Sequence, residues 1–519
     1  MMNRILCLIV CATITNMVWA QDLHVASGGS FFISPASFTY VTNDINVDGD
    51  LIVTSDTSTQ KSGSLIVKGT ATGDITYERN IQDANWHLVS APVTTQAIGA
   101  FATNLSNAVK TQVDLYAIGK YNNANLKDAR WEHYTALTAG GLNFASGKGY
   151  STSRAAAGNF TFKGGMATDD VTVTIPENDI TPFVPSVSAI TGSHVWSVVG
   201  NPYPSFLPAN TPAGASNVLL NNIASLDLYK HYINVWDGSA YVPINHSSPA
   251  YYIAPGQAFM VDAIGNSQSF VFSEATQVPQ SEATAVFYRG TTTPEIIVHL
   301  SNGTETKKTT LRYFNTSTTG LDVGYDAGTF DTSFPFAIDT HLVSDSPGMD
   351  FTIQCLPDTN FEASIVPLSI KAAANETITF RTEVAGLPDG LEVYLEDKEA
   401  RTITNISTGN HQVTLGEKLD GIGRFYLHNS VNGVLSTEDL LASTLNIYKT
   451  SNSNLRITGL QEGPATVKMY SVLGKEVTSS SFQMKTVNDI AIPNHLAKGI
   501  YIVQLITNEA KQSRKIIIE

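Results

Sequence analysis

The heptapeptide EIIVHLS, residues 295–301, places an apolar side chain at every second position. Successive side chains of a β-strand point to opposite faces, so this period of two predicts a strand with one buried face. The segments DVTVTIP at 170–176 and TITFRTEV at 377–384 repeat the pattern. Gly, Asn, Pro and Asp interrupt the chain about every ten residues, as turns between short strands do. Since no segment shows a convincing helical period, we expect an all-β, multidomain protein built of tandem antiparallel β-sandwiches.

The bulk composition narrows the class of protein. A chain of 519 residues predicts about three to five domains. Charged residues make up only 15%, and Thr, Ser, Asn and Gly fill the deficit, which suits a turn-rich β protein. The net charge of -15 argues against nucleic acid as a partner, because phosphate binding requires a basic surface.

The N-terminus follows the pattern of a secretory signal peptide. Arg4 precedes an apolar run from Ile5 to Ile14, and Ala20 supplies the small residue at a cleavage site. We therefore expect residues 1–20 to direct export and to be cleaved off after Ala20.

Two alternatives to a cleaved leader remain. A transmembrane anchor would need an apolar run about twice as long. A lipoprotein site at Cys11 would need a small residue where Val10 stands. Cleavage after position 20 would leave Cys355 alone, so the mature chain would form no internal disulfide.

Residues 84–275 contain an internal repeat with an offset of about 110 residues. WHLVSAPV at 86–93 matches WSVVGNPY at 196–203, and GKGY at 147–150 matches GQAF at 256–259. A period of this size predicts the duplication of one sandwich-sized unit. The resulting division comprises a signal peptide (1–20), an N-terminal β region (21–83), repeat 1 (84–180), repeat 2 (181–283), a larger β-sandwich domain (284–430), a linker (431–443) and a C-terminal domain (444–519).

A calcium site is a candidate in DINVDGD, where Asp44, Asn46, Asp48 and Asp50 alternate around a glycine as at the start of an EF-hand loop. The glutamate that closes such a loop is missing. Aliphatic residues occupy the intervening positions, which is also the pattern of a half-exposed strand, and we favour that interpretation.

Four aromatic residues in LYKHYINVWDGSAY form a second candidate, a platform for a sugar ring: Tyr229, Tyr232, Trp236 and Tyr241. The first repeat offers Tyr116 as the match of the first of these and Trp131 as the rough match of the tryptophan. Because both copies carry such residues, a shared role in core packing is the simpler interpretation.

Motifs for catalysis are missing from the sequence. It has no HExxH, GxSxG, Walker or CxxC pattern, and STQK at 58–61 lacks the partner motifs of a serine acylase. Adjacent acids such as Asp169 and Asp170 would point to opposite faces of a strand. We therefore expect a non-catalytic protein without a cofactor, while carboxylates brought together from distant strands remain an alternative.

The last eighty residues contain the segments LNIYKTSNSNLRITGL, ATVKMYSVLGKEV, LAKGIYIVQL and KIIIE. They closely resemble the type A C-terminal sorting domain of type IX (Por) secretion cargo from Bacteroidota. The matching positions are Gly474 and Lys475 in a turn, Gly499 and Tyr501 in a strand, and Lys515 near the end. The family usually has Tyr-Pro-Asn-Pro after its first strand, where this chain has YKTS at 448–451.

The resemblance implies a small Ig-like β-sandwich and export across the outer membrane by the type IX secretion machinery. It further implies removal by a sortase-like peptidase and release, or attachment to surface lipopolysaccharide. From the residues alone, the glycine-led strand KGIYIVQL at 498–505 would offer unpaired backbone groups to a receptor. We expect a secreted or cell-surface protein that serves in adhesion, in binding a glycan or protein ligand, or in surface structure. The alternative is a polysaccharide-degrading enzyme or its carbohydrate-binding companion.

Overall fold

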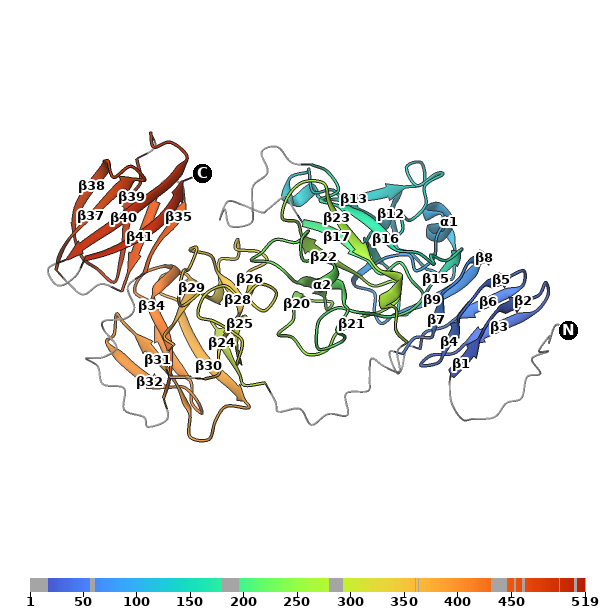
Figure 1. Cartoon of the computed structure of the whole chain (residues 1–519), viewed down its shortest axis with the longest axis horizontal. Coiled ribbons are helices and arrows are strands. Elements are labelled where there is room, and N and C mark those ends of the chain that lie inside the picture. Colours follow the sequence, from blue (N-terminus) through green and yellow to red (C-terminus); the bar gives the residue numbers. More distant parts are fainter. Residues whose placement is uncertain are drawn as a thin grey trace.

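The computed structural model describes residues 17–56, 61–179, 196–279, 293–430 except 360 and 363, and 446–518 except 452–453, 460–462, 494 and 508–510. Most of the predicted leader and the whole predicted linker thus lie outside the described residues. Strands dominate, which confirms the all-β, multidomain prediction. The modules follow one another along the long axis of the molecule, with the two termini at opposite ends (Figure 1). In the described ranges, no helix has the length and apolar character to cross a membrane.

The N-terminal module is a parallel β-solenoid, not the antiparallel sandwich that we expected. Strands of successive coils stack in parallel register on three sides. The three ladders are β1 (Met17–Ala20), β4 (Phe38–Val41) and β7 (Ser64–Val67); β2 (Leu23–Val25), β5 (Ile45–Val47) and β8 (Ala71–Gly73); and β3 (Ser30–Ile33), β6 (Asp50–Val53) and β9 (Ile75–Ile81). After each strand the chain turns a corner, and the strand pairs with its equivalent one coil later.

The two repeats have equivalent strand pairings at their ends. In the first unit β15 pairs with β9, and in the second unit β23 pairs with β16, so β9 and β16 occupy equivalent places. The first unit contains β10 (Trp86–Val89), α1 (Ile98–Thr103), β11 (Thr111–Gln112), β12 (Leu115–Tyr121), the 3-10 turn η1 (Lys127–Ala129), β13 (Trp131–Thr135), β14 (Tyr150–Ser153) and β15 (Gly158–Gly164). The second contains β16 (Val171–Ile175), β17 (Trp196–Gly200), β18 (Leu207–Pro208), α2 (Val218–Asn221), β19 (Ile233–Trp236), β20 (Tyr241–Ile244), β21 (Tyr252–Ile253), β22 (Ala258–Asp262), β23 (Gln268–Phe272) and the 3-10 turn η2 (Glu274–Thr276).

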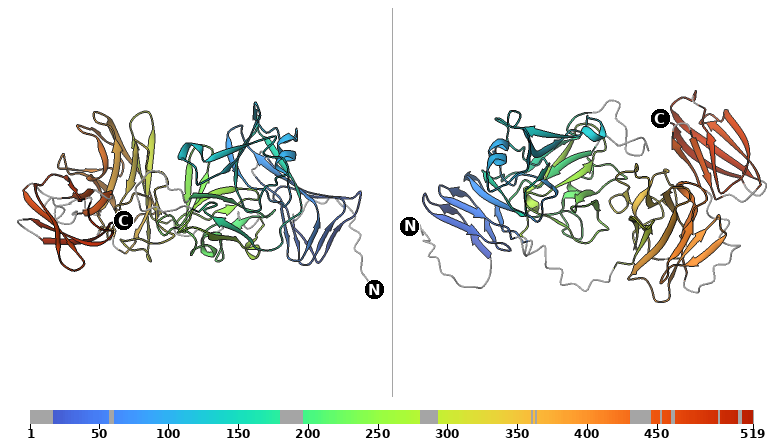
Figure 2. Two further views of the ribbon diagram at one scale, coloured as in Figure 1. Left: turned by 90° about the horizontal axis from the view of Figure 1, so that it is seen from above. Right: turned by 180° about the vertical axis from the view of Figure 1, so that it is seen from behind.

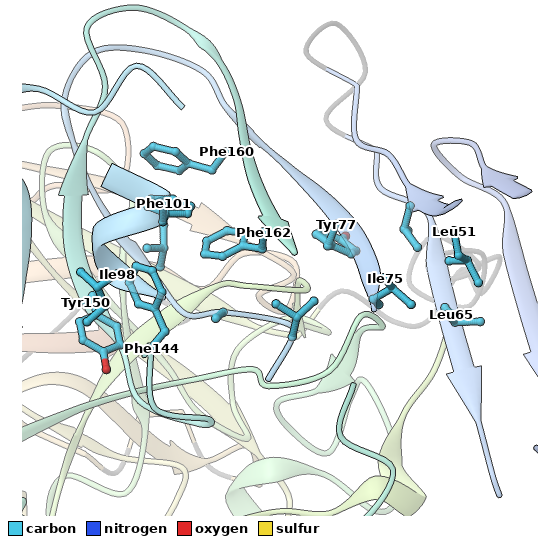
Figure 3. Packing of buried hydrophobic residues seen from close by; sticks show 14 of the residues in the cluster. Leu51, Leu65, Ile75, Tyr77, Ile98, Phe101, Phe144, Tyr150, Phe160 and Phe162 are labelled. Atoms are coloured by element: carbon cyan, nitrogen blue, oxygen red, sulfur yellow. The ribbon is translucent and has the colours of Figure 1, made fainter. Parts of the chain in front are cut away.

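One apolar core runs from the solenoid into the first unit. Figure 3 follows it from Leu51 and Leu65 in the solenoid through Tyr77 to Phe101 and Phe144 in the first unit. Phe101 on α1 makes an edge contact with Phe144, a tilted contact with Phe160 and a stacked contact with Phe162. Because the two modules share this buried cluster, we treat them as one folding unit.

A domain over residues 293–430 follows, with eleven strands in one curved sheet around its own core. Its strands are β24 (Glu295–Ser301), β25 (Thr306–Phe314), β26 (Ala327–Gly328), β27 (Ala337–Thr340), β28 (Phe351–Pro357), β29 (Val366–Ala372), β30 (Thr377–Ala385), β31 (Glu392–Asp397), β32 (Thr402–Asn405), β33 (His411–Thr414) and β34 (Leu419–Ser430). Only the β25–β28 pair is parallel among the described pairings of this sheet.

The C-terminal module is an antiparallel sandwich of two sheets with a separate core. One sheet holds β35 (Asn446–Ser451), β36 (Asn454–Thr458) and β39 (Val487–Ala491). The other has the order β38 (Glu476–Gln483), β37 (Pro464–Ser471), β40 (Gly499–Thr507) and β41 (Lys511–Ile518). Both further views place this module beside the 293–430 domain and away from the solenoid (Figure 2).

Candidate functional site

The Gly474–Lys475 motif forms the turn between β37 and β38. Gly474 has φ +78, a value that glycine adopts without strain. Its N–H donates to the carbonyl of Ser471 at 2.9 Å, and the Ser471 N–H donates to the carbonyl of Lys475 at 2.9 Å. The Lys475 side chain is therefore held at an exposed hairpin tip.

The second motif strand, β40, lies inside its sheet. Gly499 begins it with φ +152, and the Tyr501 hydroxyl donates to the carbonyl of Ala497 at 2.8 Å. β37 pairs with one side of β40 and β41 with the other, so our expectation of unpaired backbone groups here was wrong. The edges of this sheet are β38 and β41, and Lys515 is exposed on the latter. A receptor that adds a strand would have to use one of these edges.

The C-terminal module docks on the 293–430 domain through Tyr448. This residue is only 5% exposed, although it does not belong to the buried core of its own module. Its ring lies 5.2 Å from the ring of His341, centroid to centroid. A Cβ atom on Gly348 would come within 2.8 Å of the tyrosine ring, so a glycine is needed for this close approach. We call this contact the docking seat.

Two further glycines, both on β34, complete the docking seat. A Cβ atom on Gly423 would lie 2.5 Å from the side chain of Val487, and one on Gly421 would lie 2.9 Å from that of Arg456. The guanidinium of Arg456 also donates to the backbone carbonyl of Asp420. The docking seat therefore combines the glycines of β34 with a hydrogen bond from Arg456 to the backbone.

Below Tyr448 lies a chain of polar side chains in one loop. Asp350 Oδ1 is 3.0 Å from Nε2 of His341, and Ser346 Oγ is 3.4 Å from Nδ1 of the same ring. The order Ser, His, Asp is that of a hydrolase triad. However, the histidine is buried under Tyr448, and the serine oxygen already accepts the N–H of Gly348. The contacts of these three side chains stabilise the loop under the docking seat.

The predicted aromatic platform falls largely into an interdomain cluster. Tyr232 is fully buried, and its hydroxyl donates to the carbonyl of Gly328 at 2.8 Å. Trp236 donates its indole N–H to the carbonyl of Trp86, and its ring lies 5.0 Å from that of Tyr241. Tyr229 packs at 6.5 Å from Phe351. This geometry favours packing, and sugar binding by the four residues stays a prediction.

The repeats match differently around these rings than the sequence indicated. Tyr121 is the cross-strand partner of Trp131, as Trp236 is of Tyr241. The tryptophan and the tyrosine of the pair are thus exchanged between the units, so Trp131 takes the place of Tyr241. The cluster joins both units to the 293–430 domain through residues such as Phe330.

The acidic candidates for calcium lie on the outside of the solenoid and bind different neighbours. Asp44 accepts the backbone N–H of Thr70 at 2.8 Å, which is the main cause of its lowered pKa. Asp48 lies 2.9 Å from His24 and accepts an amide N–H of Asn46. The fourth candidate, Asp50, is exposed at the start of β6. Over the described ranges, no three His, Cys, Asp or Glu side chains are grouped to hold a metal ion.

Buried charged and polar groups that the sequence did not reveal lie in the second unit. Asp262 is fully buried, 3.6 Å from Lys230, and burial raises its pKa to about 8. His231 and His246 face each other at 6.0 Å, and burial lowers the pKa of His246 to about 4. No local motif marks these residues, because their neighbours come from distant strands.

An open polar groove of about 460 Å³ lies on the 293–430 domain. Strands β24, β25, β30 and β33 form its floor. Its lining includes Ser301, Thr306, Thr379, Arg381 and Gln412. The sequence did not reveal this site because its lining comes from three segments far apart in the chain, 299–306, 377–381 and 410–412.

Comparisons with known proteins divide the chain at the same place as the cores do. Residues 8–428 match the family described as "Domain of unknown function (DUF8693)". Residues 444–519 match the family described as "Secretion system C-terminal sorting domain", which confirms the predicted sorting domain. No curated protein matches the chain.

Proposed function

The chain belongs to the DUF8693 family and is cargo of type IX secretion, and from this premise we propose that it is a non-catalytic ligand-binding protein. This premise rests on the sorting domain at 444–519, which supports export to the cell surface or the extracellular space. The proposal extends to removal of this domain by a sortase-like peptidase and to attachment to surface lipopolysaccharide.

The packing within residues 8–428 supports a role in displaying a binding surface. Shared clusters join the solenoid to the first unit, and both units to the 293–430 domain. Such continuous cores hold the modules in fixed relation, as a scaffold that displays a binding face requires.

We also propose cleavage of the leader after Ala20. This cut would remove β1 from the solenoid edge. Trp19, the largest side chain of β1, is 61% exposed, so the solenoid loses little buried surface with it.

The experiment pairs localisation with binding. Deletion of residues 444–519 should leave the protein in the periplasm, and protease treatment of intact cells should no longer digest it. The purified full chain should bind members of a glycan array saturably, and no reducing sugar should be released from any bound glycan. Release of sugar would refute the non-catalytic proposal, and unchanged surface exposure of the deletion variant would refute the export route.

A further inference from the structure

The polar groove on the 293–430 domain has the regular geometry of a sheet face. Ser301 on β24 pairs with Thr306 on one side and with Thr379 on the other, and Thr379 pairs with Gln412 on β33. Directly paired residues place their side chains on the same face, about 5 Å apart. Three hydroxyls and one amide therefore form a row across four strands.

A row of basic side chains lies beside the hydroxyl row, in which Lys308 and Arg381 carry the positive charge while burial lowers the pKa of His299. His299 pairs with Lys308 on β25 and with Arg381 on β30, two residues along from the hydroxyl row. Arg381 is exposed and bound to Glu383, with 2.8 Å between Nη1 and Oε1. Nε2 of His299 also lies 3.3 Å from Oε1 of Glu383, so this carboxylate contacts both basic groups.

The two rows together match a specific ligand chemistry. Hydroxyl and amide groups exchange hydrogen bonds with the hydroxyls of a sugar, and a guanidinium binds a carboxylate through paired N–H groups. Among the described residues, no Phe, Tyr or Trp lines the groove, so charge must contribute to the affinity in place of stacking. Lys308 and Arg381 supply the positive charge beside the groove, in a chain whose overall charge is -15.

We propose that this groove binds an acidic carbohydrate, with the sugar hydroxyls on the Ser301–Thr379 row and a carboxylate at Arg381. The proposal rests on the ligand-binding function proposed above and adds the site and the ligand class. Glu383 competes with the ligand for the guanidinium and so limits affinity.

The test uses isothermal titration of the purified full chain with a hexamer of galacturonic acid, and with maltohexaose as the neutral probe. The acidic hexamer should bind saturably and the neutral one at least about tenfold more weakly, as expected for loss of a charge-assisted hydrogen bond. Arg381→Gln should weaken binding of the acidic hexamer about tenfold or more, and Thr379→Val about threefold. Glu383→Gln should tighten it about twofold.

Lys163→Gln is the matched control, because it also removes one positive charge but from an exposed position on β15 in the first unit. Its affinity should equal that of the wild type. Equal binding by Arg381→Gln, or no binding of the acidic hexamer by the wild type, would overturn the groove assignment. A chain that binds other glycans on the array, with affinity unaffected by Arg381→Gln, would keep the proposed function and lose only this site.

Discussion

Replacement of Tyr448 by alanine should separate the sorting module from the 293–430 domain without unfolding either one. The ring lies against Gly348 and His341 of the neighbouring domain, while the preceding residue, Ile447, points into the core of the sorting module. Truncation therefore removes contacts that belong mainly to the docking seat. Arg456 and its bond to the carbonyl of Asp420 would remain as a polar contact.

The expected loss follows from the burial of this ring. Truncation of a buried aromatic residue to alanine costs about 3–5 kcal/mol in a core, and an interface hot spot costs about 2 kcal/mol or more. Since Tyr448 is 5% exposed but sits at an interface, we expect a loss of about 2–4 kcal/mol in docking free energy. The undocking equilibrium should then rise roughly 30- to 900-fold.

Hydrogen exchange measured by mass spectrometry reports this change. The peptide 341–350, which lies under the ring, should exchange faster in Tyr448→Ala, while the peptide 295–301 in the same domain should not change. Tyr470→Ala, which truncates a half-exposed tyrosine on β37, is the matched control and should leave both peptides as in the wild type. Unchanged exchange at 341–350 would refute the docking seat. Faster exchange throughout β40 would show instead that Tyr448 stabilises the sorting module itself.

Two further predictions concern stability, measured by urea unfolding followed through tryptophan fluorescence. Because the folded-state pKa of His246 is lowered to about 4 from its usual 6.5, the unfolded chain binds the extra proton between these values, and stability should fall by up to about 3 kcal/mol as pH drops through that window. His246→Gln should reduce this slope, and an identical slope in the variant would contradict the assignment. Gly73→Ala should destabilise the solenoid by about 3 kcal/mol or more, because φ is +81 and the new Cβ would lie 2.0 Å from the carbonyl oxygen of Val47. Gly28→Ala, with φ +75 but open space, should cost only about 1–2 kcal/mol, and equal losses in the two variants would show that the close contact does not matter.

Strand content was predictable because it depends on local patterns. Alternation in EIIVHLS places Ile296, Val298 and Leu300 inside the domain, as the structure confirms. The parallel solenoid was not predicted, because DINVDGD has the same alternation whether its strand pairs within a hairpin or one coil later. A solenoid differs from a hairpin in the turn that follows the strand. At Gly73 this turn requires a glycine because the chain passes close to Val47 of the preceding coil, a contact that the local sequence does not show.

The candidate sites were harder to predict for the same reason. The turn at Gly474 is local and was found from its motif. The groove needs Thr379 beside Gln412, which pair across β30 and β33. The buried pair needs Lys230 near Asp262. In both cases about thirty residues of chain separate the two partners. The free-strand expectation for β40 failed for a different reason: the next strand, β41, folds back on it as a hairpin and covers its second side.

The distribution of apolar cores explains why the chain divides into an exported body and its sorting module. The shared clusters described above leave no junction in the body without buried apolar contacts. The sorting module keeps its own core, and its contacts with the body include Tyr448, glycine backbone, a polar bond from Arg456 and an ion pair of Arg514 with Asp345 at 3.4 Å. Such an interface is closer to a transient contact than to a core, so the body does not depend on it for folding. A module that the secretion machinery must recognise would be expected to have this kind of contact.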